Sequence, residues 1–302
     1  MFKQMDDSRD YFGRLNSTML VATFFSLWLA VYLENRVEDT LGYIMILSFG
    51  ILHGANDIKL LQTTAKKERK SPVYLRILLY YIIFVIAVAG LFYLVPTASL
   101  SLFILFSAYH FGEQHWTSRF KGRGWPEAMF FSFYGLFVLF LLFTAHGDEV
   151  SSIVYDICGV RTEPKIYLIA LAVSGIILVL LYIKIVKQIK REILLELFYL
   201  GVFFIVFNTA SLLWAFAIYF IIWHSIPSLS DQINYLYGVF DRQNFLKYVR
   251  SSAIYWGLSV LSLVLLFNFV DQSNTGFLPF LFSFLAAITF PHVFVIRKLN
   301  KN

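Results

Sequence analysis

The chain has 302 residues, of which 59% are hydrophobic and only 15% charged, and its mean hydropathy is +0.69. An ordinary soluble domain is nearer half apolar with about a quarter of its residues charged, so the composition excludes that class. The net charge of +6 does not indicate nucleic-acid binding, because the basic residues fall in short clusters between apolar blocks, as in cytoplasmic loops. Cys158 is the only cysteine, which excludes an internal disulfide and a cysteine-rich metal site.

Apolar segments of about twenty residues follow one another along the chain, a pattern typical of helices that span a bilayer. Ten can be drawn, at residues 17–34, 40–62, 73–95, 98–118, 126–146, 165–187, 193–208, 210–229, 251–270 and 276–297. Only Asn208 and Thr209 separate the seventh from the eighth, so the count of about ten allows eight or nine. The sequence therefore predicts an all-α, polytopic transmembrane helix bundle.

The distribution of lysine and arginine predicts the orientation, because these residues favour the cytoplasmic side. If the amino terminus is cytoplasmic, all of them except Arg36, Arg161 and Lys165 fall on that side. We therefore expect ten helices with both termini cytoplasmic, in a multi-pass protein of the cell membrane. We interpret residues 1–302 as a single integral membrane domain, with a cytoplasmic segment at 1–16, a helix bundle at 17–298 and the longest outer loop at 147–164.

Four histidines are the strongest chemical signal. His53, His110, His224 and His292 lie on the second, fourth, eighth and tenth segments, which all run from outside to inside in this topology. Each lies about 12 to 16 residues into its segment, so their depths differ by roughly 6 Å at the helical rise of 1.5 Å per residue. We therefore expect them to converge on one metal-binding site, since neutral imidazole is the commonest metal ligand. The alternative is four unrelated histidines, each hydrogen-bonded to a neighbouring helix.

Two carboxylates accompany these histidines. Asp57 follows His53 by four residues and Glu113 follows His110 by three, so each could share a helix face with its histidine. A metal-bound imidazole usually donates its other N–H to a carboxylate or carbonyl, and we predict that Asp57 and Glu113 orient the imidazoles in this way. The same carboxylates could instead bind the metal or face the cytoplasmic water.

The remaining histidines are expected outside the site. His115 lies five positions after His110, which turns it about 140° around the helix, and His146 falls at the outer end of the fifth segment. Two prolines lie beside site histidines. We expect Pro227 to kink or end the eighth helix and Pro291 to break the tenth, which is tolerated at membrane depth where the backbone lines a cavity.

Several kinds of site could use these residues. A membrane diiron desaturase uses paired histidine boxes, and the six histidines here include no H-x-x-x-H pair. A bis-histidine haem protein would need only two of the four histidines. A transporter could use the histidines, Asp57 and Glu113 as a proton relay. A mononuclear all-histidine site suits an Fe(II) centre that activates O2 without an organic cosubstrate.

Four motifs, taken together, resemble a known family. They are HGAND at residues 53–57, YHFG at 109–112, WHS at 223–225 and PH at 291–292. The combination resembles the Brp/Blh proteins, the bacterial and archaeal β-carotene 15,15′-dioxygenases related to the bacteriorhodopsin-related protein. The resemblance spans residues near 50 to 297, most of the chain.

This resemblance implies a membrane-embedded, non-haem Fe(II) oxygenase that cleaves the central 15,15′ double bond of β-carotene with O2. The products would be two molecules of all-trans-retinal, which typically serve a microbial rhodopsin. The alternative is a non-catalytic protein with the same polar core, either a carotenoid- or retinal-binding accessory protein or a proton-coupled transporter.

The resemblance also implies iron ligation by His53, His110 and His224. The family commonly has two histidines four apart in the eighth-helix region, whereas here the positions four residues from His224 hold Phe220 and Ser228. Its shared depth makes His292 the expected fourth ligand, with the Ser228 region or water as alternatives.

Overall fold

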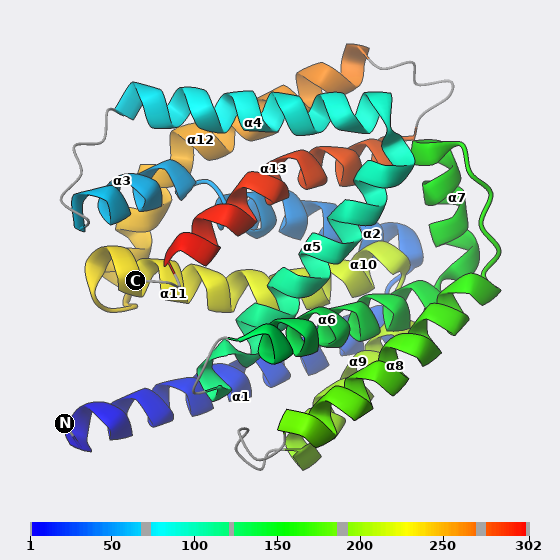
Figure 1. Cartoon of the computed structure of the whole chain (residues 1–302), viewed down its shortest axis with the longest axis horizontal. Helices are drawn as coiled ribbons and strands as arrows, with labels where there is room; N and C mark the ends of the chain where they lie inside the picture. Colours follow the sequence, from blue (N-terminus) through cyan, green and yellow to red (C-terminus); the bar gives the residue numbers. More distant parts are fainter. Residues whose placement is uncertain (1, 68–73, 121–123, 186–192, 270–275, 300–302) are drawn as a thin grey trace.

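The computed structural model describes residues 2–67, 74–120, 124–185, 193–269 and 276–299 (Figure 1). Within these ranges the chain is mostly helical and has no strand, so the predicted all-α class is confirmed. Parts of the predicted cytoplasmic loops lie outside the described residues, including those that hold Arg69, Lys121 and Lys190.

The helical elements follow one another with short connections. In chain order they are α1 (Phe2–Tyr32), α2 (Asn35–Met45), the π-helix η1 (Ile46–Gly50), α3 (Asp57–Lys67), α4 (Tyr74–Leu94), α5 (Pro96–Trp116), the 3-10 turn η2 (Thr117–Arg119), α6 (Trp125–Ala145), α7 (Gly147–Cys158), α8 (Lys165–Ile185), α9 (Ile193–Thr209), α10 (Leu212–Ala217), the π-helix η3 (Ile218–Ser225), α11 (Ile226–Tyr237), α12 (Arg242–Phe269) and α13 (Phe277–Leu299).

Within the described ranges, seven helical stretches are long and apolar enough to cross a membrane. They are Leu15–Tyr32 of α1, α4, α6, α8, the continuous run Leu212–Tyr237, α12 and α13. The other three predicted segments are helical but different in kind. The α5 helix carries polar side chains along its second half, α9 has only 17 residues, and a turn divides the segment at 40–62. The ten-helix count and the cytoplasmic termini stay predictions.

The predicted outer loop at 147–164 was wrong in part, because α7 forms over Gly147–Cys158. Its apolar residues Val150, Ile153, Val154 and Ile157 have the i, i+3, i+4, i+7 spacing of an amphipathic helix. The helix ends at Gly159, whose φ of 68° is the left-handed conformation that closes many helices. Its apolar side packs toward α5, α6 and α13.

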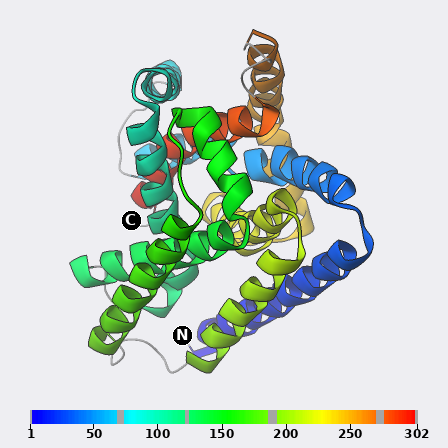
Figure 2. The ribbon, with the colours of Figure 1, turned by 90° about the vertical axis from the view of Figure 1, so that its right-hand side faces the viewer.

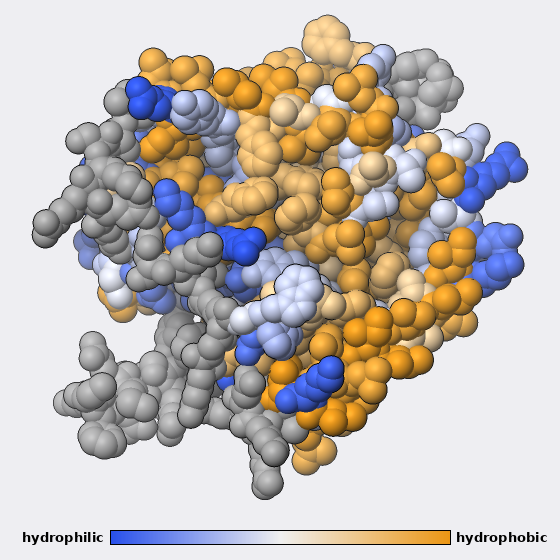
Figure 3. Space-filling view, viewed as in Figure 1, coloured by the Kyte–Doolittle hydropathy of each residue, from blue (hydrophilic) through white to orange (hydrophobic). Residues whose placement is uncertain are grey.

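The helices divide into a buried centre and an exposed periphery. In an apolar stretch of 18 residues within Leu212–Tyr237, 83% of the residues are buried, whereas the share in the corresponding stretch is 6% for α4 and 11% for each of α8 and α12. In both ribbon views α4 and α12 lie at one edge of the molecule and α8 and α9 at the opposite edge (Figures 1 and 2). Apolar side chains cover much of the visible face (Figure 3), as expected for helices that contact lipid.

The α5 and α6 helices pack closely through two glycines. A Cβ atom added to Gly112 would lie 1.9 Å from the backbone oxygen of Phe131, and one added to Gly135 would lie 1.9 Å from that of Ala108. Small residues of this kind let membrane helices approach backbone to backbone. Because His110 lies between Ala108 and Gly112, this contact also positions its stretch of backbone.

We predict that Gly112→Ala lowers the midpoint of thermal unfolding in detergent by several degrees, because α5 and α6 must separate and overpacking typically costs about 1–3 kcal/mol. The matched control is Gly257→Ala in α12, where no atom lies within 4 Å of the added methyl group. Alanine is the better helix former, so this control should match or exceed the wild-type midpoint. Equal midpoints for the two variants would contradict the close contact.

Candidate functional site

The four histidines predicted to converge lie together at the centre of the molecule. The ring centroid of His53 is 4.8 Å from that of His292 and 5.5 Å from that of His224. The centroid of His110 is 4.7 Å from that of His224 and 5.4 Å from that of His292. All four side chains are buried. Each imidazole ring therefore neighbours two of the others, and the four residues are called the histidine cluster.

Irregular backbone positions two of these histidines. His224 lies within the π-helix η3, where the Ser225 hydroxyl donates to the carbonyl oxygen of Phe220 at 2.8 Å. His53 lies in the hydrogen-bonded turn between η1 and α3, so the predicted second helix is interrupted at this histidine. Turns of π-helix are frequent at functional sites, because the extra residue re-aims the side chains.

Neither proline ends its helix. Pro227 occupies the first turn of α11 directly after η3, and the helical run Leu212–Tyr237 continues through it, so the expected kink at Pro227 stays a prediction. Pro291 lies inside α13, which continues from Phe277 to Leu299 without a break. The predicted break before His292 was therefore wrong.

The free nitrogens of the histidine cluster point to a shared ligand. Five ring nitrogens are buried without a hydrogen-bond partner, namely Nδ1 of His53, both nitrogens of His110, Nδ1 of His224 and Nε2 of His292. Buried polar groups are nearly always paired, so this concentration of unpaired imidazole nitrogens needs an explanation. Neutral imidazole nitrogens are ligands for iron, zinc and copper.

The spacing of the rings fits a metal ion. With a metal–nitrogen bond of about 2.1 Å, two imidazoles at bond angles of about 90–120° have ring centroids roughly 4.6–5.6 Å apart. The four separations in the histidine cluster, 4.7, 4.8, 5.4 and 5.5 Å, all fall in this range. Among the described residues, no three His, Cys, Asp or Glu side chains are already arranged as a metal site, so the rings would have to turn to share an ion.

Asp57 contacts a different histidine from the one expected. Its Oδ1 lies 2.8 Å from Nδ1 of His292, and its Oδ2 accepts a hydrogen bond from the Tyr81 hydroxyl at 2.9 Å. The predicted pairing with His53 assumed one continuous helix, and the turn at His53 removes that alignment. The arrangement fixes the tautomer of His292 and leaves its Nε2 free, as carboxylates that accept the other N–H of a metal-bound imidazole do.

The predicted orienting role of Glu113 toward His110 was wrong. The Tyr109 hydroxyl donates to Oε1 of Glu113 at 2.8 Å, while neither nitrogen of His110 has a partner. Glu113 is one helical turn from both residues, and its carboxylate is directed to the hydroxyl at i−4. His110 is therefore held by helix packing and not by a carboxylate.

His115 belongs to a separate buried network, as its rotation around α5 predicted. Its Nε2 lies 2.9 Å from Oε2 of Glu196 in α9, and its ring stacks on Tyr134 with the centroids 4.9 Å apart. Arg119 also pairs with Glu196. This network joins α5, α6 and α9 beside the histidine cluster, and His146 lies outside both, at the junction of α6 and α7.

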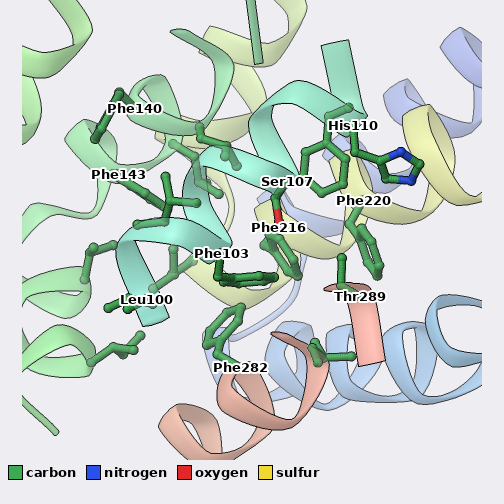
Figure 4. A pocket seen from close by; sticks show the side chains of 18 of the residues that line it. Leu100, Phe103, Ser107, His110, Phe140, Phe143, Phe216, Phe220, Phe282 and Thr289 are labelled. Atoms are coloured by element: carbon green, nitrogen blue, oxygen red, sulfur yellow. The ribbon is translucent and has the colours of Figure 1, made fainter. Parts of the chain in front are cut away.

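Two cavities meet at the histidine cluster. The α5–α8 cavity has a volume of about 130 Å³ and lies between α5, α6, α7, α8, α10 and α13, and its lining is mostly Phe, Leu, Ile and Val (Figure 4). The α4–α12 cavity lies among η1, α4, α12 and α13 and includes hydroxyl side chains and Asp57. The two cavities share five lining residues: His53, Phe220, Leu285, Thr289 and His292.

Sequence reasoning missed three parts of this site. They are the pairing of Tyr81 with Asp57, the hydroxyls of Ser107 and Thr289 in the cavity lining, and the apolar side of α7 that closes the α5–α8 cavity. The spacing of Ser107, three residues before His110, and the periodicity of α7 were the available signals. No sequence signal indicated the contact of Tyr81, because its partner Asp57 is 24 residues away along the chain.

The comparisons with known proteins give the family. The family model described as β-carotene 15,15′-dioxygenase matches residues 44–300 of this chain. No curated protein and no solved structure matches it. The match covers most of the chain, including all four histidines, and the chain therefore belongs to the β-carotene 15,15′-dioxygenase family, as its motifs indicated.

We predict that Glu196→Ala destabilises the protein, because it removes the carboxylate shared by His115 and Arg119, and breaking a buried ion pair typically costs about 3–5 kcal/mol. The midpoint of thermal unfolding in detergent should fall by several degrees. The matched control is Glu163→Ala, whose pair with Lys165 is exposed and should contribute little. A midpoint equal to that of the control would show that this network does not stabilise the fold.

Proposed function

We propose that this chain is a membrane-embedded, non-haem Fe(II) oxygenase that cleaves the central 15,15′ double bond of β-carotene with O2 to give two molecules of retinal. The observation that supports this most strongly is the meeting of two apolar-lined cavities at the histidine cluster, in a chain of the β-carotene dioxygenase family. A long substrate that occupied both cavities would have its middle at the histidines.

The residues that would hold the iron are His53, His110, His224 and His292. Their free nitrogens, ring spacing and burial fit a metal ion with imidazole ligands. When bound, Fe(II) supplies the redox chemistry that allows O2 to react with a carbon–carbon double bond. Ser228 is a poorer candidate for the fourth position, because its hydroxyl accepts a hydrogen bond at 3.2 Å from Gln232, four residues later on α11.

The protein itself would orient the metal ligands and would provide an apolar cavity that excludes water. Asp57, held by Tyr81, would keep the proton of His292 on Nδ1 and so direct Nε2 toward the metal. The aromatic side chains Phe103, Phe216, Phe220 and Phe282 line the α5–α8 cavity (Figure 4), where a flat polyene would pack against them and water would be excluded.

The lipid bilayer would serve as the source of the substrate. A hydrocarbon such as β-carotene partitions into lipid, and the peripheral helices α4 and α12, which are largely exposed and apolar, border one of the two cavities. The retinal products would be released to the same phase, from which we expect a microbial rhodopsin to take them up.

A cell-based assay tests the reaction. Expression of the chain in β-carotene-producing cells should remove the orange colour with retinal appearing in extracts, and His110→Ala should leave the cells orange, because it deletes a metal ligand. The control is His146→Ala, which lies outside the histidine cluster and should retain activity. Undiminished retinal formation in His110→Ala would exclude the role proposed for His110.

Metal analysis of the purified protein tests the site. We expect about one iron per chain in the wild type, loss of iron in His292→Ala, and an affinity about 10–100-fold weaker in Asp57→Asn, because outer-shell partners typically contribute that much. Ser228→His should leave iron binding unchanged.

Iron retained in His292→Ala and bound more tightly in Ser228→His would move the fourth ligand to α11. No iron in a folded preparation supplied with Fe(II), together with no O2 consumption, would favour the non-catalytic accessory protein or the transporter.

A further inference from the structure

Ser107 presents a free hydroxyl to the α5–α8 cavity. The residue is 3% exposed, it lines the cavity, and its Oγ has no hydrogen-bond partner. In Figure 4 this oxygen points into the cavity, on the side of Phe103 and Phe216. An unpaired hydroxyl in an apolar environment is unfavourable, so its place in the cavity lining calls for a ligand with a matching polar atom.

Other serines on the same helix are satisfied by the backbone. The Ser99 hydroxyl donates to the carbonyl oxygen of Val95 at 3.0 Å, and that of Ser101 donates to the carbonyl oxygen of Thr97 at 2.8 Å. This bond to the preceding turn is the usual solution for serine in a helix that faces lipid or protein. Ser107 does not make this bond to the preceding turn, and it lies on the stretch of α5 that faces the histidine cluster.

The position of Ser107 on α5 places it near the histidine cluster. It precedes His110 by three residues, so the two side chains share a face of α5 with their Cβ atoms about 5–6 Å apart. The Tyr167 hydroxyl, whose residue also lines the cavity, is already paired with Thr162 at 2.7 Å. A molecule that lies along the cavity with its polar atom beside the histidine cluster would therefore meet the Ser107 hydroxyl.

We propose that Ser107 donates a hydrogen bond to the carbonyl oxygen of a polyene aldehyde held in the α5–α8 cavity. This inference rests on the proposed function, since cleavage at the histidine cluster would leave a new carbonyl at the inner end of each product half. β-Carotene itself has no acceptor atom, so Ser107 contributes to binding of the product and not of the substrate. The half in the α5–α8 cavity is retained more strongly than it would be by apolar contacts alone.

Direct binding of all-trans-retinal to the purified full chain tests this without any turnover. Retinal should bind the wild type with a lowered carbonyl stretching frequency, measured by vibrational difference spectroscopy, because a hydrogen bond weakens the C=O bond. Ser107→Ala should lose this shift and bind retinal about fivefold more weakly, as expected for one net hydrogen bond. Ser107→Cys, a weak donor of similar shape, should behave in the same way and guards against a packing defect in the alanine variant.

Two controls separate hydrogen bonding from packing. Ser99→Ala removes a hydroxyl that is bonded to the backbone of the same helix and should bind retinal like the wild type. The hydrocarbon with the same polyene but no oxygen should bind equally to the wild type and to Ser107→Ala. Unchanged frequency and affinity in both Ser107 variants, or equal losses for retinal and the hydrocarbon, would overturn the proposal.

These binding measurements can fail or succeed independently of the test of the proposed function. If the chain cleaves β-carotene but the Ser107 variants bind retinal normally, only the role of Ser107 fails. If it does not cleave β-carotene but binds retinal with a Ser107-dependent frequency shift, the aldehyde site stands and the oxygenase proposal fails.

Discussion

The unpaired imidazole nitrogens at the centre of the bundle are the constraint on which the other features depend. A buried polar group without a partner typically costs about 1–3 kcal/mol, and five ring nitrogens of the histidine cluster are in that state. An apolar core built for stability alone would place Leu or Phe at such positions. The convergence of four histidines from four separate parts of the chain, at one depth, is therefore best explained by a ligand that they share.

The backbone around the histidine cluster is adapted to bring these side chains together. The π-helix η3 rotates His224 inward, the turn after η1 frees His53 from helical geometry, and Gly112 lets α5 approach α6 so closely that His110 is fixed by packing. Only His292 is held by a carboxylate, through Asp57 and Tyr81. Each histidine is thus positioned by a different local feature, so loss of one of these features need not displace the other three side chains.

The two cavities differ in the polarity of their linings. The α5–α8 cavity is almost entirely carbon apart from the histidines and a few hydroxyls, whereas the α4–α12 cavity contains Asp57, several serines and Tyr255. The two halves of a cleaved polyene would therefore leave environments of different polarity. In the proposed reaction, the Ser107 hydroxyl would add to this difference and would make the departure of the two products physically distinct steps.

The sequence by itself determined the helical class, seven of the membrane-length segments and the meeting of the four histidines, because an apolar run must satisfy its backbone within a helix and the rise per residue is constant. It also supplied motifs specific enough to indicate the family. Tertiary structure decided the rest. Asp57 pairs with His292 because the helix breaks at His53, and Glu113 is directed to Tyr109. The position of a residue along a helix axis follows from counting residues. The direction of its side chain depends on each local turn and on neighbours from distant parts of the chain.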